Sequence, residues 1–241
     1  MNKNDICTLE ITSISNEGLG VGRAEDGRAV FVPMSAAGDI CRVKILKVKS
    51  SYAYGKIEEI ITPSRDRKEI DCSSFGRCGG CCFRHISYEA ELAAKENFIK
   101  DAFTRIGKLS PKFLPIVKNQ SINRYRNKAQ YPLGKNREGQ AVCGFYAPNS
   151  HRVLPCESCM LQPEIFSEIA AFITDFIREN KLSVYDEAQR RGVLRHICIR
   201  RGHYSGEICV VIVARRKIPE IRRLAKAVTE RFPDVKGVVL N

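Results

Sequence analysis

The sequence predicts an α+β protein with a five-stranded β-barrel at its N-terminus, then a cysteine-rich loop with a connecting helix, then an α+β domain. Short alternating segments separated by glycine turns occupy residues 6–61, which is typical of a small barrel. Helical patterns alternate with apolar strand patterns after residue 120. The chain of 241 residues contains 11 cysteines, and three of them lie close together between these two parts. We therefore expect three parts, at 1–62, 63–110 and 111–241.

The barrel prediction depends on alternation and on turn signals. Asp26-Gly27 and Gly38-Asp39 are turn signals between strand patterns. Gly18, Gly20 and Gly22 are not followed by a helical pattern, so they indicate a bent strand and not a dinucleotide-binding loop. Five strands at this spacing are typical of an OB-like barrel. The expected strands cover residues 6–14, 27–33, 41–49 and 52–61, with a glycine-punctuated turn and strand at residues 17–22.

Charge and aromatic residues point to a nucleic-acid partner. The formal net charge is +13, from 40 Lys and Arg against 27 Asp and Glu, which favours a polyanion. In the barrel, Lys44 and Lys47 precede Tyr52, and single-stranded RNA is bound by this combination of cations and rings. The alternative is a solvated strand edge protected by lysines, on a surface that is basic without a partner.

The cysteine-rich loop predicts a metal or cluster site. Cys72, Cys78 and Cys81 follow a C-x5-C-x2-C spacing in a glycine-rich loop, and Cys156 or Cys159 can supply a fourth thiolate. One alternative is a structural zinc on Cys78, Cys81, Cys156 and Cys159. Another is a [4Fe–4S] cluster on the first three cysteines and one of the last two. Free cysteines that only pack as small apolar residues are the plainest alternative.

The C-terminal part combines helices with basic strands. A helix is expected from Ser87, its N-cap, to about residue 106, and two more at residues 163–180 and 219–232. Strands are expected at 121–133, 192–201, 207–214 and 235–240. The first of these would place cationic and polar side chains on one face beside tyrosines, and the second carries a further arginine. The RNA-binding candidates here are Arg124, Arg126, Lys128, Gln130, Tyr131 and Arg195.

The sequence also predicts where the protein is found. No run of residues is apolar enough for a membrane span, and the N-terminal residues do not form a secretory signal. Eleven cysteines in a chain of this kind favour metal ligation over disulfides. We therefore expect a cytoplasmic protein with no membrane partner.

Several motifs resemble one family. Residues 1–62, with Gly18-Leu19-Gly20-Val21-Gly22 and residues 26–33, resemble a TRAM domain, an RNA-binding barrel. Together with the cysteine loop, residues 125–130, 144–151 and 192–196, they resemble the RNA (uracil-5-)-methyltransferase family of the 23S ribosomal RNA type. The resemblance implies a [4Fe–4S] cluster with Cys159 as the fourth ligand, ahead of zinc, and ribosomal RNA as the partner.

The family also implies features that this sequence lacks. Its members bind S-adenosylmethionine on a doubly wound sheet and use a cysteine in an Asp-Pro-Pro-Arg context, and neither feature occurs in these 241 residues. We therefore expect no catalytic residue and no Rossmann-like domain here, with the methyl donor bound only in a missing domain. On this interpretation the chain is the RNA-recognition and iron–sulfur portion of a methyltransferase. The alternative is a free-standing RNA-binding iron–sulfur or zinc protein without catalysis.

Overall fold

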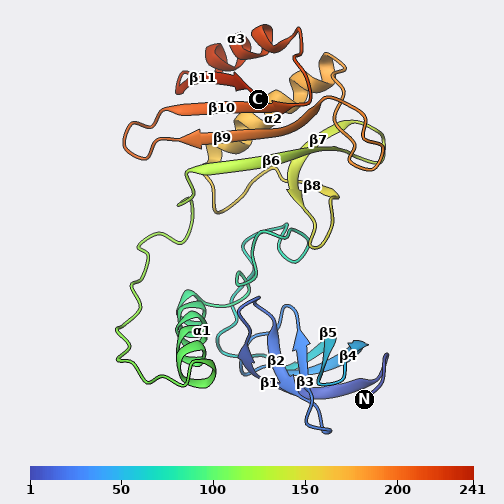
Figure 1. Cartoon of the computed structure of the whole chain (residues 1–241), viewed down its shortest axis with the longest axis vertical. Helices are drawn as coiled ribbons and strands as arrows, with labels where there is room; N and C mark the ends of the chain where they lie inside the picture. The colour runs from blue at the N-terminus through green and yellow to red at the C-terminus, as the bar shows by residue number, and fades with distance from the viewer. The chain divides into compact units, whose positions relative to one another are not determined.

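The computed structural model describes all residues from 1 to 241 and divides them into two units (Figure 1). Unit 1 consists of residues 1–76 and 81–120, and unit 2 of residues 77–80 and 121–241. The cysteine-rich loop is therefore shared between the two units. Residues 63–110, expected as a connecting part, belong to unit 1 except for residues 77–80.

Unit 1 contains a closed barrel of five strands in the order β1-β2-β3-β5-β4. Alternation of apolar and polar residues turns side chains such as Leu9, Ile11, Val43 and Ile45 into the barrel, where at most 2% of their surface is exposed. Strands β3 and β5 pair in parallel, and this pairing closes the barrel. The strands are β1 (Ile6–Ile14), β2 (Gly20–Arg23), β3 (Ala29–Val32), β4 (Ile40–Val48) and β5 (Tyr52–Thr62).

A buried carboxylate ties the segment after the barrel to the turn before β4. Asp39 is fully buried and accepts hydrogen bonds from the backbone N–H of Ala36 at 2.6 Å and of Ser64 at 2.9 Å. The guanidinium of Arg67 donates two more, at 2.8 Å from Nε and 2.7 Å from Nη2. The expected turn at Gly38-Asp39 therefore also holds Ser64 and Arg67, in the segment that follows β5, against the barrel.

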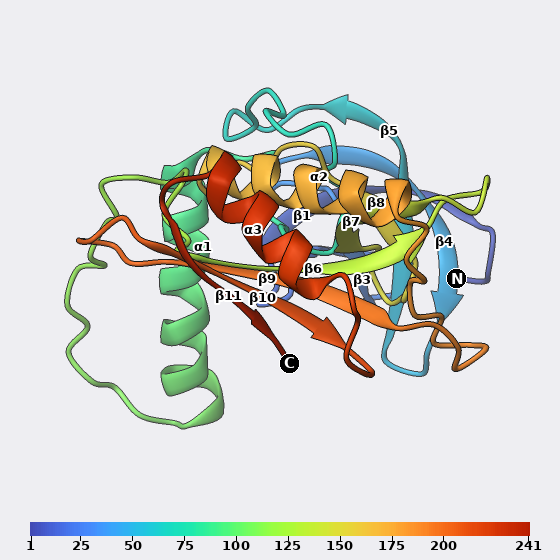
Figure 2. The same cartoon turned by 90° about the horizontal axis from the view of Figure 1, so that it is seen from above.

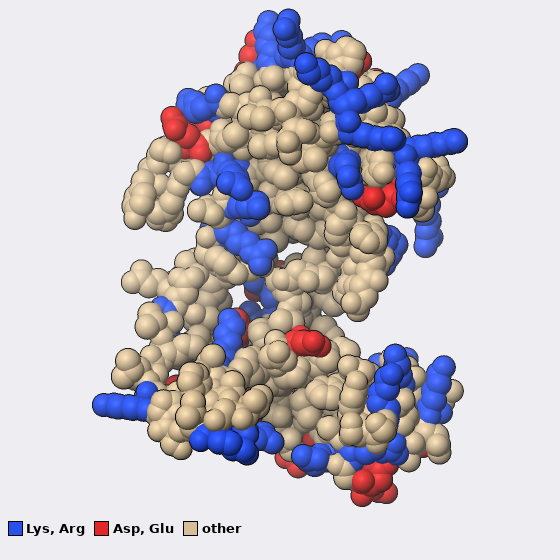
Figure 3. All heavy atoms as spheres, in the orientation of Figure 1, with Lys and Arg blue, Asp and Glu red and all other residues tan.

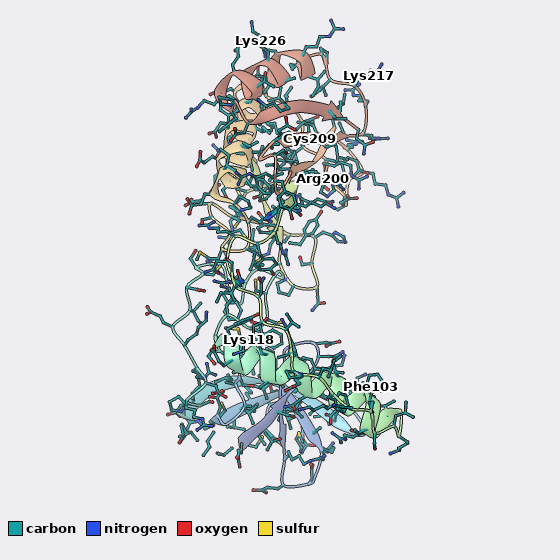
Figure 4. All side chains as sticks on the ribbon, turned by 90° about the vertical axis from the view of Figure 1, so that its left-hand side faces the viewer. Phe103, Lys118, Arg200, Cys209, Lys217 and Lys226 are labelled. Carbon is teal, nitrogen blue, oxygen red and sulfur yellow. The ribbon has the colours of Figure 1, made fainter.

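Helix α1 (Tyr88–Asp101) follows the cysteine loop and begins at Ser87, whose hydroxyl accepts from the N–H of Ala90 at 3.2 Å. A π-helical turn (Ala102–Ile106) continues it, and Phe103 lies in that turn (Figure 4). The apolar residues of this segment form no buried face: in α1 only Leu92 is buried, and Ile106 in the π-helical turn is 83% exposed.

Unit 2 is a six-stranded sheet in the order β11-β10-β9-β6-β7-β8. Helices α2 (Glu164–Glu179) and α3 (Ile221–Arg231) both pack on one face of it (Figure 2). The short strand β8 and most of β7 were not expected, because three to six residues give little periodicity. The strands are β6 (Lys128–Lys135), β7 (Ala141–Tyr146), β8 (Val153–Pro155), β9 (Leu194–Arg201), β10 (Ile208–Ala214) and β11 (Val235–Leu240).

The apolar stripe of α2 fixes which face of the sheet is covered. Phe166, Ile169 and Ile173 are fully buried against inward side chains of the sheet such as Ile197 and Ile199. Alternation along β6 and β9 then directs the intervening residues to the face without helices. This helix-free face of unit 2 displays half-exposed and exposed residues. No helix in the protein combines the length and the apolar character needed to cross a membrane.

Candidate nucleic-acid interface

Three aromatic rings form a cluster on the outer surface of the barrel, which we call the barrel patch. Phe31 on β3 lies 5.7 Å from Tyr52 and 5.7 Å from Tyr54, both on β5, and the two tyrosines lie 5.6 Å apart between ring centroids. All three are partly exposed. They share a face because Phe31 pairs with Tyr54 in the parallel β3–β5 ladder. Partly exposed rings at this spacing can stack with successive bases of a single strand.

The cations beside the barrel patch are only partly neutralised. Lys47 pairs with Tyr54 across the β4–β5 ladder, and Lys44 pairs with Lys56. Lys56 contacts Glu58 in an ion pair of 2.9 Å, whereas Lys44 and Lys47 form no ion pair. Lys47 therefore lies beside the barrel patch, and Lys44 lies further along the β4–β5 ladder. The role of Lys44, Lys47 and Tyr52 in RNA binding stays a prediction.

A second group of candidates lies on the helix-free face of unit 2. Lys128 and Gln130 are exposed on β6, and they pair with Arg200 and Cys198 of β9. Burial raises the pKa of the Cys198 thiol, and the positive charges of Lys128 and Arg200 act against that rise. Arg200 also pairs with Cys209 of β10 (Figure 4). This face thus combines cations with small half-buried side chains. Lys and Arg side chains project from both units in Figure 3.

A cavity of about 270 Å³ lies in unit 2 beside β6, β7 and β9, and we call it the β7–β9 pocket. The predicted residue Arg195 is part of its lining, together with motif residues to which the sequence gave no role. Its lining includes Lys135, Tyr146, His151, Arg152, Tyr185, Glu187, Arg195 and His196.

Ring and charge contacts define the chemistry of this pocket. The guanidinium of Arg195 lies 4.7 Å from the ring centroid of Tyr185 and forms an ion pair with Glu187. The rings of Tyr146 and His151 contact each other edge to face at 5.5 Å. Burial lowers the pKa of His196, and the nearby charge of Arg195 lowers it further, so its ring is neutral at pH 7. The pocket therefore offers rings, cations and a neutral imidazole.

The structure corrects the predicted position of Arg124 and Arg126. Both precede β6, which begins at Lys128, and Arg124 has a positive φ of 57°, so they do not lie on a strand face. The guanidinium of Arg124 donates to the carbonyl oxygens of Cys159 at 3.0 Å and Gln162 at 2.9 Å. Its role in this structure is to hold the loop that carries Cys159.

Tyr131 does not fit its predicted role as a stacking platform. Its side chain is fully buried in the core of unit 2, and its hydroxyl donates to Oε1 of Gln162 at 2.5 Å. Its ring is therefore not accessible to a base. The alternation that places Lys128 and Gln130 outside necessarily places Tyr131 inside.

The candidate metal ligands are divided between the two units, with Cys72 and Cys81 in unit 1 and Cys78 and Cys159 in unit 2. No three His, Cys, Asp or Glu side chains lie close enough together to hold a metal ion. In unit 1, Arg84 donates to Asp71 at 2.6 Å. Its pKa is raised first by that carboxylate and also by the nearby thiols of Cys81 and Cys72. A fixed cation therefore lies beside two of the predicted ligands.

Comparison with known proteins identifies the N-terminal barrel. Residues 3–57 match the TRAM domain family. The barrel is a TRAM domain. The match covers β1 to β4 and the greater part of β5, and therefore includes the whole barrel patch.

The remaining comparisons extend over the whole chain. It is 37% identical to an uncharacterized RNA methyltransferase from Halalkalibacterium halodurans, over 100% of this chain and 53% of that protein. It is 36% identical to one from Clostridium tetani, over 99% of this chain and 52% of that protein. The chain thus spans about half the length of these curated relatives.

A solved structure shares the fold. The crystal structure of Pyrococcus abyssi tRNA (uracil-54, C5)-methyltransferase in complex with S-adenosyl-L-homocysteine matches with a TM-score of 0.63. The match covers 90% of this chain and 48% of that chain, at 22% sequence identity. At that identity the likeness establishes the fold alone.

These comparisons correct the sequence-based view of the chain as a part without catalysis. That view confined the methyl donor to a missing domain and inferred the absence of a donor-binding fold. However, the whole chain matches proteins named as RNA methyltransferases, and its fold matches a methyltransferase solved with S-adenosyl-L-homocysteine. The predictions of a missing donor domain and of a non-catalytic fragment are therefore wrong, and the motifs absent from 241 residues did not justify them.

Proposed function

We propose that this protein acts in the methylation of RNA, with S-adenosylmethionine as the methyl donor and C5 of a uracil as the acceptor. The observation that carries the proposal is the similarity of the entire chain to proteins named as RNA methyltransferases. The TRAM domain, with its barrel patch, supports RNA as the partner. S-adenosylmethionine supplies the methyl group, and the residues of this chain hold and orient the RNA.

Ribosomal RNA is the substrate class that the sequence resemblance implies, and transfer RNA is the alternative given by the name of the solved neighbour. Both substrates are read out in one experiment. The gene is deleted in the source cell, and 5-methyluridine is quantified by mass spectrometry in purified ribosomal and transfer RNA. We expect loss of a 5-methyluridine from ribosomal RNA. Loss from transfer RNA alone would reassign the substrate, and unchanged levels in both would refute the proposal.

We propose that the barrel patch contributes RNA affinity through stacking. Replacing Phe31 and Tyr54 with alanine removes two rings and no charge, and stacking contributes roughly 1–3 kcal/mol per base. Binding of a single-stranded oligonucleotide should therefore weaken by roughly 5- to 150-fold for each ring that contacts a base. Tyr204→Ala is the matched control, because Tyr204 is 98% exposed in the β9–β10 turn, outside the patch. Equal losses for the patch and the control would contradict the proposal.

A [4Fe–4S] cluster on Cys72, Cys78, Cys81 and Cys159 is proposed as the resident cofactor. The spacing of the first three cysteines supports it. So do the hydrogen bond from the N–H of Gly80 to Sγ of Cys78 at 3.4 Å and the cation of Arg84 near two of the thiols, because such contacts stabilise charged clusters. Arg124 would orient Cys159 through its carbonyl oxygen.

Elemental analysis of protein purified without oxygen distinguishes this cluster from zinc. We expect iron, lost in Cys72→Ser and retained in Cys156→Ser. Zinc without iron, retained in Cys72→Ser and lost in Cys156→Ser, would establish the alternative site on Cys78, Cys81, Cys156 and Cys159. The expected location of the protein is the cytoplasm, where cysteine thiols are kept reduced and available as ligands.

A further inference from the structure

We propose that the β7–β9 pocket binds one unpaired nucleotide of the RNA. The base would lie against the tyrosine rings, and the phosphate would face the cations at the rim. This inference rests on the proposed function, because it takes RNA as the ligand. It goes beyond that function in assigning a specific subsite to unit 2, separate from the barrel patch.

A β-bulge creates the pocket wall. Across β9 and β10, His196 pairs with Val213 and Leu194 pairs with Ala214, so Arg195 is one extra residue in β9. Leu194 and Ile197 are both fully buried in the core, and the bulge therefore turns Arg195 and His196 together toward the same side, away from the core. Bulges are a common means of re-aiming a side chain at a functional site.

The cations that line the pocket favour an anionic ligand. Glu187 already pairs with Arg195, and the carboxylate of Asp186 accepts a hydrogen bond from the N–H of Gln189 at 2.9 Å. Lys135 and Arg152, by contrast, form no ion pair. The lining thus carries three cationic side chains against the two carboxylates of Asp186 and Glu187, a net positive charge that suits a phosphate group.

Two polar groups in the pocket, Nε of Arg195 and the imidazole of His196, can form hydrogen bonds with the edge of a base. Nε of Arg195 is buried and has no hydrogen-bond partner, so it is a donor that a ligand can satisfy. The neutral ring of His196 provides one donor and one acceptor. The ring of Tyr185 is already stacked by Arg195 on one side, while the ring of Tyr146 also contributes to the lining. An extruded nucleotide is recognised by such a combination of stacking and edge contacts.

Photochemical cross-linking tests the assignment directly. The probe is a single-stranded RNA of about 12 nucleotides with 4-thiouridine at every uridine, irradiated with this chain and mapped by mass spectrometry. We expect cross-links to Tyr146, His151 or Tyr185. Cross-links confined to unit 1, with binding retained, would overturn the pocket and leave the proposed RNA methylation standing. An absence of any RNA binding would count against both.

Variants distinguish the pocket from general electrostatic attraction. Arg195→Met removes the guanidinium, and Arg222→Met removes the same charge from α3, outside the pocket. Of these two arginine variants, Arg195→Met should abolish the pocket cross-links and lower affinity at least about fivefold, whereas Arg222→Met should retain the cross-links. Tyr185→Leu keeps every charge and should also lose cross-links, and circular dichroism verifies the fold of each variant. Equal cross-linking in all variants would overturn the proposal, as would displacement of the cross-links by S-adenosylmethionine.

Discussion

Replacing Asp39 with asparagine preserves the shape of the side chain and removes its charge. Asp39 is fully buried and accepts four hydrogen bonds, two from the backbone and two from Arg67. Asparagine has a single acceptor oxygen, and its amide group would face N–H donors in place of the second oxygen. At least two donors would then lose their acceptor, at about 1–3 kcal/mol each.

The expected loss agrees with the cost of breaking a buried ion pair. Arg67 is only 19% exposed, so its charge would remain largely buried without a partner, for which about 3–5 kcal/mol is typical. We therefore expect Asp39→Asn to lower the free energy of unfolding of unit 1 by about 3 kcal/mol or more. The chain has no tryptophan, so urea unfolding is followed by circular dichroism, with hydrogen exchange of β1–β5 amides as the local measure.

The matched control is Asp26→Asn, which also removes a carboxylate from an arginine pair. The Asp26–Arg28 pair lies at the surface, where water replaces lost hydrogen bonds, so no resolvable change is expected. The interpretation of the Asp39 network would be refuted if the two variants lost equal stability.

The hydrogen bonds of Asp39 should also make the stability of unit 1 depend on pH in the acid range. Burial raises the pKa of Asp39, but the hydrogen bonds from Arg67, Ala36 and Ser64 outweigh burial, and the net pKa is lowered. A carboxyl whose pKa is lower in the folded state stabilises the protein above its unfolded pKa of about 3.9. That stability is lost as pH falls through the folded value. Wild-type unit 1 should therefore lose stability as pH falls below about 4, and Asp39→Asn should not show this part of the loss.

Two further predictions concern unit 2. Arg124→Met should lower its stability by about 1–3 kcal/mol, because two backbone carbonyls lose their donor. Arg126→Met, which removes an exposed charge nearby, should leave thermal unfolding unchanged, and equal shifts in melting temperature would contradict the account. Tyr131→Phe should leave RNA affinity unchanged in a fluorescence anisotropy titration and lower stability by about 1 kcal/mol, since Gln162 loses its donor; a weaker affinity would restore Tyr131 as an RNA contact.

The sequence predicted the strands and helices better than it predicted which of their side chains are buried. Alternation and turn residues predicted all five barrel strands and both helices of the sheet, because these patterns depend on neighbouring residues only. Period-two alternation also predicts that Tyr131 faces the core, because Lys128 and Gln130 face the solvent on the opposite side of β6. By contrast, Ile106 in the π-helical turn after α1 is 83% exposed, because a local apolar pattern does not indicate whether another part of the protein packs against it.

The sites depend on features that periodicity cannot reveal. The bulge at Arg195 depends on the register of β9 against β10, which is a long-range property. The barrel patch depends on the parallel pairing of β3 with β5, which joins Phe31 to two tyrosines more than 20 positions later in the sequence. The sequence could suggest Tyr52 because lysines lie near it along the chain, but it gave no signal that Phe31 lies beside it.

The net charge of +13 also does not identify the cations that face RNA. Arg67, Arg84 and Arg124 are engaged with buried or partly buried acceptors, so their charges stabilise the fold. Lys44 and Lys47 on the barrel form no ion pair. Each phosphate contact contributes a slope of about 0.7 for single strands in a plot of log affinity against log salt. The salt dependence of RNA binding should therefore reflect the few unpaired surface cations, and not the total excess of positive charge.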